Sequence, residues 1–339
     1  MSARTLDAGI VGLGAYLPSR IVTNDDLAVV LETSDDWIRT RTGIRQRHVA
    51  APEQATSDLA AVAGKAALAD AGLGVEDVAG VVVATTTPDH TVPGTAPLVA
   101  AALGTEAGAF DVNAACSGFV YGLKVGAALA VADAAPVLVI GAETLSRIVD
   151  PTDRSVAVLF GDGAGAVVLA PGRGPIGPFV LGADGSDPSM LWTRSGGTRQ
   201  PSTPATLAAR SQYLTMRGGD VYRQAVARMA GAAIDALERA GLQPDDVDVF
   251  VGHQANGRIL EAVRQRVGIA TDRTLVTVDQ HGNTSAASIP LALATARERG
   301  ALRPGDTVLL AAFGAGLSWG ACLLTWTGDD LHHTSEVAR

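Results

Sequence analysis

One of the two cysteines in the sequence lies where a thiol could act as a nucleophile. Cys116 follows the strand-like residues 109–112 and opens the apolar, helix-like run CSGFVYGLKVGAALAVA. Unpaired backbone N–H groups at a helix start favour the thiolate, the reactive form of cysteine. A lone cysteine in an alanine-rich run can equally be a small buried hydrophobe, so position alone leaves both interpretations of Cys116 open. Cys322, inside the strand-like ACLLTW, is predicted to be a core residue.

The second half of the chain carries polar side chains that could serve the same reaction. His253 ends the strand-like residues 247–252 and precedes NGRILEAVRQRV, whose apolar residues have helical spacing. A histidine at the end of a strand points toward a cleft, although a capping role explains its position equally well. His281, next to Gly282, is a competing candidate. Asn283 in GNTSAASIP could serve catalysis or simply satisfy free N–H groups in a turn.

Two glycine-rich segments fit nucleotide-binding patterns only in part. Residues 12–14, Gly-Leu-Gly, follow a strand-like run but lack the third glycine and the acidic residue of a dinucleotide-binding fingerprint. Residues 161–165, GDGAG, lead into the strand-like AVVLA rather than into a helix with a phosphate-binding lysine. We therefore expect no nicotinamide cofactor, and a tight structural turn at residues 161–165.

Composition narrows the class of protein. The chain has 339 residues, a net charge of −9 and a pI near 5.1, so it offers no basic field to nucleic acid. Two cysteines without a spaced framework predict a reducing compartment, with neither a disulfide nor a metal site. Residues 1–7 lack a signal pattern, and the longest apolar region, 125–142, is broken by Asp133 and Pro136. We expect a cytoplasmic protein without a membrane span.

The elements that must position these residues occur twice in the sequence. Residues 67–82, ALADAGLGVEDVAGVV, match residues 236–251, ALERAGLQPDDVDVFV, at eight of sixteen positions, with an offset of 169. Each copy is typical of a helix end with a glycine C-cap, at Gly72 or Gly241, then an acidic turn and a short buried strand. Repeated strand and helix units predict an α/β fold made by duplication.

The same offset pairs two junctions between a strand and a helix. It places residues 110–116, which end at Cys116, over residues 279–285. A site can then form where the two halves meet. The cluster of Pro and Gly at residues 171–178 is the expected join of the two halves, and the polar residues 182–212 are predicted to be a long loop.

Six ordered motifs together closely resemble those of β-ketoacyl-acyl-carrier-protein synthase III, over nearly the whole chain. They are SDDWIRTRTGIRQRH at 34–48, DVNAACSGF at 111–119, FGDGAGA at 160–166, HQANGR at 253–258, GNTSAASIP at 282–290 and FGAGLSWG at 313–320. The resemblance implies an α/β, thiolase-like fold, whose two related halves pack as a five-layered αβαβα arrangement. It implies an N-terminal half at residues 1–172, with the nucleophilic cysteine, and a C-terminal half at 173–339, with the histidine and asparagine.

The resemblance also implies an activity. Cys116 would accept an acyl group from acyl-CoA and join it to malonyl-acyl-carrier protein with loss of carbon dioxide, giving a 3-oxoacyl-carrier protein that begins a fatty acid or polyketide chain. His253 and Asn283 would support decarboxylation, and Phe313 would assist them. The backbone N–H groups of Cys116 and Ala315 would form an oxyanion hole. No metal or cofactor is expected, because acyl-CoA is a substrate; His281 and Cys322 have no matching role.

Further positions concern substrates and partners. By resemblance Trp37, Arg41 and Asn256 bind CoA, and Arg223 and Arg258 are candidates for docking the acidic carrier protein.

The chain departs from the family pattern at three positions, and a homodimer is expected. Gly219 stands where Asn is frequent, Gly252 where Pro is common, and Val92 at a loop position that is often aromatic. Gly219 and Val92 are candidate residues of the starter pocket. Val92 belongs to a segment that in relatives reaches the partner's pocket, so its smaller side chain predicts a longer or branched starter.

Three alternatives accompany this interpretation. A related acyltransferase would move the acyl group from cysteine to an alcohol or amine without decarboxylation, but the presence of His253 and Asn283 argues against it. A non-catalytic partner subunit of a ketosynthase would lack the nucleophile, whereas Cys116 is present. A plant-type polyketide synthase also uses Cys, His and Asn, but fits the quoted motifs less well.

Overall fold

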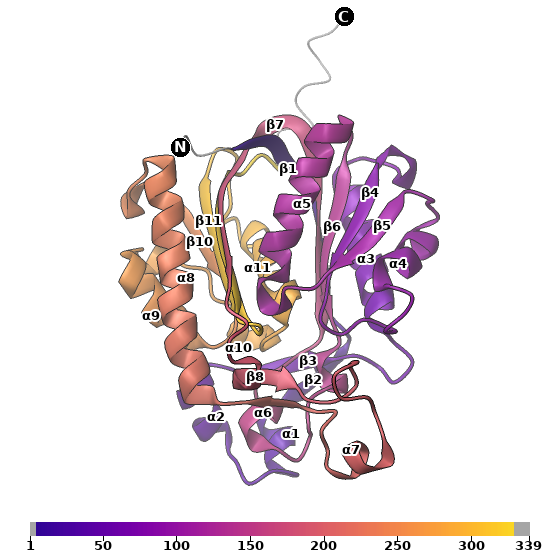
Figure 1. Ribbon diagram of the computed structural model, residues 1–339. Helices are drawn as coiled ribbons and strands as arrows, with labels where there is room; N and C mark the ends of the chain where they lie inside the picture. Colours follow the sequence, from indigo (N-terminus) through magenta and orange to yellow (C-terminus); the bar gives the residue numbers. More distant parts are fainter. Residues whose placement is uncertain (1–4, 329–339) are drawn as a thin grey trace, which may run out of the picture.

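A computed structural model describes residues 5–328 as layers of helices and strands (Figure 1). The strands are β1 (Leu6–Tyr16), β2 (Arg20–Thr23), β3 (Gln46–Val49), β4 (Gly80–Ala84), β5 (Gly108–Val112), β6 (Val137–Glu143), β7 (Gly163–Ala183), β8 (Leu191–Thr193), β9 (Leu214–Met216), β10 (Val249–Gly252), β11 (Thr307–Gly314) and β12 (Ser318–Thr325). The helices are α1 (Asn24–Ala28), α2 (Asp35–Thr42), α3 (Thr56–Asp70), α4 (Thr95–Leu103), α5 (Gly118–Asp133), α6 (Arg154–Ala157), α7 (Pro204–Ala208), α8 (Gly218–Ala240), α9 (Gly257–Val267), α10 (Val278–His281) and α11 (Ser288–Glu298).

One continuous sheet of eight strands runs through both halves of the chain. Its order is β10-β11-β12-β7-β6-β4-β5, and β1 pairs with β7 in addition. The first part of β7 pairs with β6, and its last part pairs with β12. The long strand β7 therefore links two arms of the sheet, and each arm carries parallel strands, β4 with β5 and β6, and β10 with β11.

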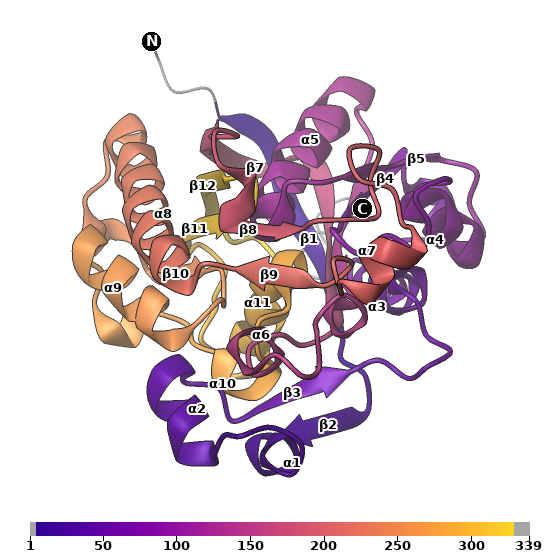
Figure 2. The ribbon, with the colours of Figure 1, turned by 60° about the horizontal axis from the view of Figure 1, so that its bottom comes forward.

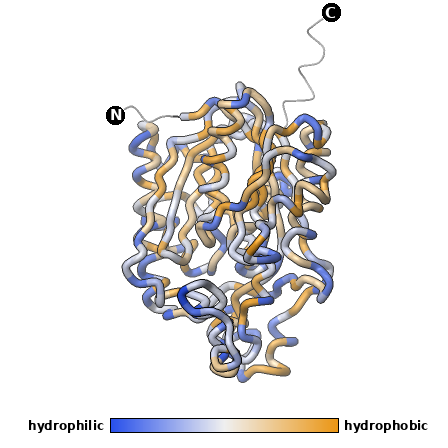
Figure 3. Tube along the Cα trace, turned by 45° about the vertical axis from the view of Figure 1, so that its right-hand side comes forward, coloured by the Kyte–Doolittle hydropathy of each residue, from blue (hydrophilic) through white to orange (hydrophobic). Residues whose placement is uncertain are grey.

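The helices divide into one inner layer and two outer layers, as predicted. Helices α5 and α11 lie between the two arms, α3 and α4 cover one arm, and α8 and α9 cover the other (Figure 1). Three clusters of buried apolar side chains fill the spaces between these layers. The middle cluster contains Phe119 and Ile289, one outer cluster contains Leu59, and the other contains Met229. Apolar segments run through the interior of the molecule, whereas many of the hydrophilic segments lie at its outer turns (Figure 3).

The internal repeat is visible in the structure. Gly72 and Gly241 both have a positive φ, 65° and 72°, and each lies between an outer helix and a short buried strand, β4 or β10. Only glycine adopts this conformation without a steric cost, which explains Gly241 as the C-cap of α8 and Gly72 directly after the C-cap of α3.

The register at the centre of the repeat differs by one residue from the prediction. Ala115 and Ser285 have the unusual positive φ values of 47° and 48°, and each begins a 3₁₀ turn that leads into α5 or α11. The two junctions therefore correspond at an offset of 170, and Ala115, rather than Cys116, is the counterpart of Ser285. One residue has been gained or lost between the outer and the inner part of the repeat.

The expected join at residues 171–178 lies within β7, because this strand continues from one arm of the sheet into the other. Residues 182–212 are largely irregular as predicted, but include β8 and α7. Together with β2, β3, β9, α1, α2 and α6 they lie at one end of the layers (Figure 2).

One segment, Ala115–Asp133, is long and apolar enough to cross a membrane by length and composition alone. It is mainly the inner helix α5, and 56% of it is buried inside the protein.

Candidate active site

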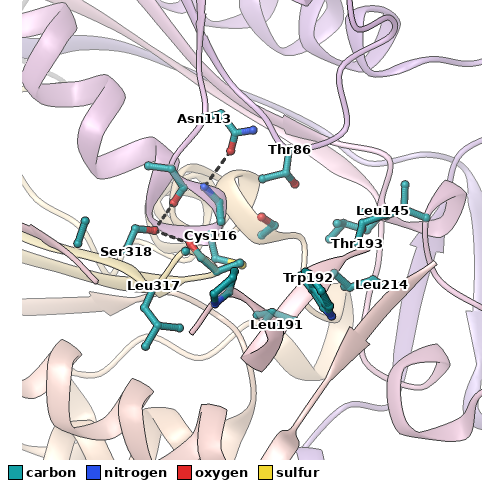
Figure 4. A pocket seen from close by; sticks show the side chains of 18 of the residues that line it. Thr86, Asn113, Cys116, Leu145, Leu191, Trp192, Thr193, Leu214, Leu317 and Ser318 are labelled. Atoms are coloured by element: carbon teal, nitrogen blue, oxygen red, sulfur yellow. Dashed lines mark hydrogen bonds between the residues drawn. The ribbon is translucent and has the colours of Figure 1, made fainter. Parts of the chain in front are cut away.

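Cys116 lies in the 3₁₀ turn that precedes α5. The turn is held by Ser117, whose hydroxyl donates to the carbonyl of Ala114 at 2.7 Å. The side chain of Asn113 accepts a hydrogen bond from the backbone N–H of Ala115 at 3.3 Å (Figure 4). Strand, turn and helix thus present the thiol at the positive end of a buried helix, as the sequence predicted.

Burial opposes the expectation that this position favours the thiolate in the free protein. Burial raises the pKa of the Cys116 thiol to about 12, and the Glu143 carboxylate adds to the rise, while a hydrogen bond with Ser285 lowers it. Removal of the thiol from water disfavours the charged form more than hydrogen bonds with Ser285 and with the Cys116 backbone favour it. The resting nucleophile is therefore a neutral thiol.

Two backbone N–H groups near Cys116, those of Cys116 and Ala315, are the candidates for the expected oxyanion hole. The end of β11 packs so closely on the turn that a Cβ atom on Gly314 would lie 2.5 Å from the Cys116 nitrogen. Among the described residues, neither the Cys116 N–H nor the Ala315 N–H donates to another backbone group outside helices and strands. Ala315 and Cys116 also line the same cavity, so both groups are free to bind an oxyanion there.

His253 is brought to Cys116 by β10 and is held firmly in place. Its backbone N–H donates to Ala311 at 2.8 Å, and its Nδ1 lies 2.7 Å from the hydroxyl oxygen of Ser288. Burial lowers the pKa of the His253 imidazole to about 3, so the ring is neutral at physiological pH. The next residue, Gln254, donates to the carbonyls of Gly252 and Leu275 and thereby fixes the loop.

Asn283 lies beside His253 and has a defined orientation. It is 6% exposed, and its Oδ1 accepts a hydrogen bond from the Ser285 N–H at 2.9 Å. Its Nδ2 group therefore faces the cavity that Asn283 lines together with His253, Cys116 and Phe313. The structure thus brings together Cys116, His253 and Asn283, to which the resemblance gave catalytic roles, and Phe313, to which it gave a supporting role.

Two cavities meet at Cys116. The larger, about 550 Å³, is walled by large apolar side chains, and no charged side chain of the described residues lines it (Figure 4). These walls are Leu145, Ile148, Phe160, Leu191, Trp192 and Leu214. The smaller, about 490 Å³, contains His253, Asn283 and Phe313, together with Arg223 and Arg258. The thiol can therefore hold a group in one cavity while a second group approaches through the other.

The residues expected to bind CoA lie near the smaller cavity, and one residue adds to them. The guanidinium carbons of Arg41 and Arg154 lie 4.6 Å and 4.5 Å from the centre of the Trp37 ring. Asn256 lines the smaller cavity and donates to the carbonyl of Arg41 at 3.3 Å. Sequence reasoning missed Arg154 because it lies in a turn-rich stretch with no periodic pattern.

The two candidate docking arginines line the smaller cavity, but they differ in charge environment. Arg223 forms an ion pair with Asp220, whereas Arg258 lies 5.7 Å from the centre of the Tyr222 ring. Arg258 is therefore the more available positive charge.

Neither candidate residue of the starter pocket lines the larger cavity of its own chain. Gly219 lines the smaller cavity, while Val92 is 84% exposed and lines neither.

Two residues that the sequence offered as candidates, His281 and Cys322, lie apart from the cavities at Cys116. His281 is buried next to His48, with ring centres 6.1 Å apart, and lines neither cavity at Cys116. Cys322 is fully buried in β12, and burial raises its pKa strongly. Within residues 5–328, no group of three or more potential metal-ligating side chains is found.

Sequence reasoning also missed a buried carboxylate beside the nucleophile. Glu143 is completely buried and accepts hydrogen bonds from the hydroxyls of Thr87 and Ser285, at 2.6 Å and 2.9 Å. Its pKa is raised by burial, which these hydrogen bonds oppose. No motif in the sequence marks Glu143, because its partners come from distant segments.

Comparison with known proteins gives concordant results. Residues 110–185 match the family model of 3-oxoacyl-[acyl-carrier-protein] synthase III, and residues 237–326 match the model of its C-terminal part. A β-ketoacyl-[acyl-carrier-protein] synthase III of Streptomyces coelicolor is 51% identical over 95% of this chain and 98% of its own length.

Solved structures of the same kind superpose closely. The 3-oxoacyl-(acyl carrier protein) synthase III of Pseudomonas aeruginosa has a TM-score of 0.87 and 46% identity, covering 95% of this chain and 98% of that one. A priming β-ketosynthase of the R1128 polyketide pathway has a TM-score of 0.89 and 35% identity, covering 97% and 98%.

Proposed function

This chain belongs to the 3-oxoacyl-[acyl-carrier-protein] synthase III family, and from that premise we propose how its own residues divide the reaction. The enzyme joins an acyl-CoA starter to malonyl-acyl-carrier protein with loss of carbon dioxide. The observation that carries the proposal is the position of Cys116 between two cavities, one apolar and uncharged, the other containing His253 and Asn283.

In the first half-reaction Cys116 takes the acyl group. Its sulfur forms a bond to the thioester carbon, the bond from that carbon to the sulfur of CoA breaks, and the thiol proton leaves with the CoA thiolate. The oxyanion that develops in between accepts hydrogen bonds from the N–H groups of Cys116 and Ala315. CoA lies along the smaller cavity, with its adenine end against Trp37, Arg41 and Arg154, and Asn256 supports this wall.

In the second half-reaction malonyl-acyl-carrier protein enters through the smaller cavity. Its carbon–carboxylate bond breaks, carbon dioxide leaves, and the electron pair becomes an enolate whose oxygen accepts hydrogen bonds from His253 and Asn283. The enolate carbon then attacks the acyl thioester, and the Cys116 thiolate leaves and takes up a proton. Phe313 keeps the malonyl carboxylate poorly solvated. The step needs no external oxidant, and we propose that it needs no cofactor.

The starter acyl group is apolar and larger than acetyl. It occupies the larger cavity, because the smaller one must admit the malonyl group to His253 and Asn283. An apolar cavity of about 150 Å³ accommodates benzene, so the volume of about 550 Å³ in the single chain has room for an acyl group larger than acetyl. The absence of charged side chains among the described lining residues also disfavours charged acyl groups.

The proposal extends to partners and compartment. The carrier protein docks near Arg258 and Arg223, at the mouth of the smaller cavity. The chain forms a homodimer through the outer edge of β5, the last strand of the sheet, where Phe110 is 41% exposed. The two halves, 1–172 and 173–339, act as one unit in the cytoplasm, where acyl-CoA and carrier proteins occur.

The experiment follows both half-reactions separately. Intact-mass analysis records acyl loading from acetyl-, isobutyryl- and hexanoyl-CoA, and release of carbon dioxide from malonyl-acyl-carrier protein records condensation. We expect faster loading of isobutyryl and hexanoyl groups than of acetyl, by at least about tenfold, and none in Cys116→Ala. Loading without carbon dioxide release would favour the acyltransferase alternative, and a preference for acetyl would contradict the assigned starter class.

A further inference from the structure

The side chain behind His253 has not been assigned a role. Ser288 is the first residue of α11, is 2% exposed, and its hydroxyl oxygen lies 2.7 Å from His253 Nδ1. The same oxygen accepts a hydrogen bond from the backbone N–H of Gln254 at 3.3 Å. Ser288 therefore contacts both the catalytic ring and the loop that carries it.

Counting donors and acceptors at Ser288 fixes the direction of its contact with the ring. The oxygen already accepts from Gln254, and among the described residues the hydroxyl proton has no acceptor other than His253 Nδ1. If Nδ1 carried the proton and donated to Ser288, the buried hydroxyl proton would be left without a partner. A buried donor without a partner costs about 1–3 kcal/mol. The hydroxyl therefore donates to Nδ1, and the proton of the neutral ring lies on Nε2.

We propose that Ser288 is a positioning residue that holds His253 as the Nε2–H tautomer, so that the ring donates a hydrogen bond to the malonyl thioester and does not act as a base. The inference rests on the proposed function for its substrate, but the tautomer itself is a property of the free protein.

Two observations support this assignment. The buried ring has a pKa lowered to about 3, so it is neutral and its tautomer decides what it offers to the cavity. Asn283 is oriented in a similar way, because its Oδ1 accepts from the Ser285 N–H and leaves Nδ2 as a donor. The start of α11 therefore orients both catalytic side chains, one through Ser285 and the other through Ser288.

Decarboxylation of the malonyl group requires only hydrogen-bond donors at the position of His253. Loss of carbon dioxide from the malonyl group transfers no proton, because the carboxylate leaves as carbon dioxide and its electron pair passes to the enolate. A histidine that took a proton from Cys116 would become an imidazolium, which the buried site disfavours. An Nε2–H donor fits the charge that develops on the thioester oxygen.

The kinetic test compares variants of one helix. Ser288→Ala should slow release of carbon dioxide from malonyl-acyl-carrier protein by about 10–100-fold in kcat, with KM little changed. Acyl loading from hexanoyl-CoA should change less than threefold, and Ser288→Thr, which keeps the hydroxyl, should restore most of the rate. The matched control is Thr295→Val, which removes a hydroxyl of α11 that bonds only to the carbonyl of Leu291. It should leave both half-reactions unchanged.

The structural test reads the tautomer directly. The chain has only six histidines, so ¹⁵N NMR of histidine-labelled protein can assign His253 by comparison with His253→Gln. We expect a protonated Nε2 and an unprotonated Nδ1 in the free protein, and a mixture of tautomers in Ser288→Ala. A proton on Nδ1 in the unchanged protein, or an equal loss of loading and condensation in Ser288→Ala, would overturn the proposal. If the unchanged protein releases no carbon dioxide, the proposed function fails, but the spectrum still decides the role of Ser288.

Discussion

The starts of α5 and α11 have the same backbone but different side chains. Each has an asparagine whose Oδ1 accepts the N–H two residues later, Asn113 with Ala115 and Asn283 with Ser285. In each, that second residue has a φ near +48° and begins a 3₁₀ turn and a buried helix. Only the first turn contains a cysteine, and only the second asparagine lies beside a histidine.

The difference shows how duplication can divide one reaction. Both helix starts direct a positive end toward the centre of the molecule, which suits the negative charge of either half-reaction. The first start adds a side chain that can form a covalent bond. In the proposed reaction, the second adds two N–H donors, His253 and Asn283, with Ser285 and Ser288 as their supports. The starts of α5 and α11 thus share their backbone geometry, and a few side chains determine which half-reaction each of them serves.

The largest predicted effect distinguishes Asn283 from Asn113, the corresponding asparagine of the first half. Asn283→Ala should slow condensation by about 10²–10³-fold, because a donor to the enolate is lost. Acyl loading should change by less than fivefold, since the oxyanion of that step is bound by backbone groups. Both rates can be measured by single-turnover mass spectrometry and carbon dioxide release.

The matched variant is Asn113→Ala, at the corresponding position of the first half. It lies in the larger cavity and supports only the Ala115 N–H, so it should affect loading and condensation to a similar, small extent. If Asn113→Ala impaired condensation as strongly as Asn283→Ala, the two helix starts would not be divided as we describe.

Much of the fold could be predicted from the sequence, because the repeat of residues 67–82 at 236–251 exposes the duplication. The grouping of Cys116, His253 and Asn283 required the resemblance, since each residue alone had an equally good structural explanation. The offset of 169 came from the outer helices and missed the extra residue that precedes the inner ones. Such a local change is invisible without coordinates.

Other features depend on distances that no sequence pattern encodes. The state of Cys116 is a balance between a helix end and burial, and only the structure shows that its thiol is removed from water beside Glu143. Arg154 and Ser288 contact Trp37 and His253 from segments far away in the chain. Their own surroundings in the sequence look like an ordinary turn and an ordinary helix start.

A smaller effect concerns the charge of the nucleophile. The pKa of Cys116 is raised to about 12, mainly by burial, so the thiolate is a minor species at neutral pH. Its fraction rises about tenfold for each pH unit below the pKa. Alkylation of Cys116 by iodoacetamide should therefore accelerate about tenfold per unit from pH 7 to pH 10 without a plateau. Peptide mapping distinguishes Cys116 from Cys322, which should remain unmodified in the folded protein.

The opposite outcome would change the comparison. A plateau of the alkylation rate at or below pH 8 would mean that the start of α5 stabilises a thiolate in the free protein. The helix end would then outweigh burial, as the sequence alone suggested, and the resting state of the first half would be charged.

The smallest predicted effect removes a side-chain difference between the two turns. Ser285→Ala gives the second turn the residue type found at Ala115, and it keeps the backbone N–H that orients Asn283. The Ser285 hydroxyl donates to Glu143, which retains donors from Thr86 and Thr87, so the free energy of unfolding measured in urea should fall by about 1 kcal/mol.

The kinetic effects of Ser285→Ala should be small. Condensation should change less than fivefold, because both donors to the enolate remain. Loading should also change less than fivefold, since the Ser285 hydroxyl donates its proton to Glu143 and the oxyanion of that step is bound by backbone groups. A loss of condensation as large as that expected for Asn283→Ala would mean that the Ser285 hydroxyl, and not its backbone, supports the second half-reaction.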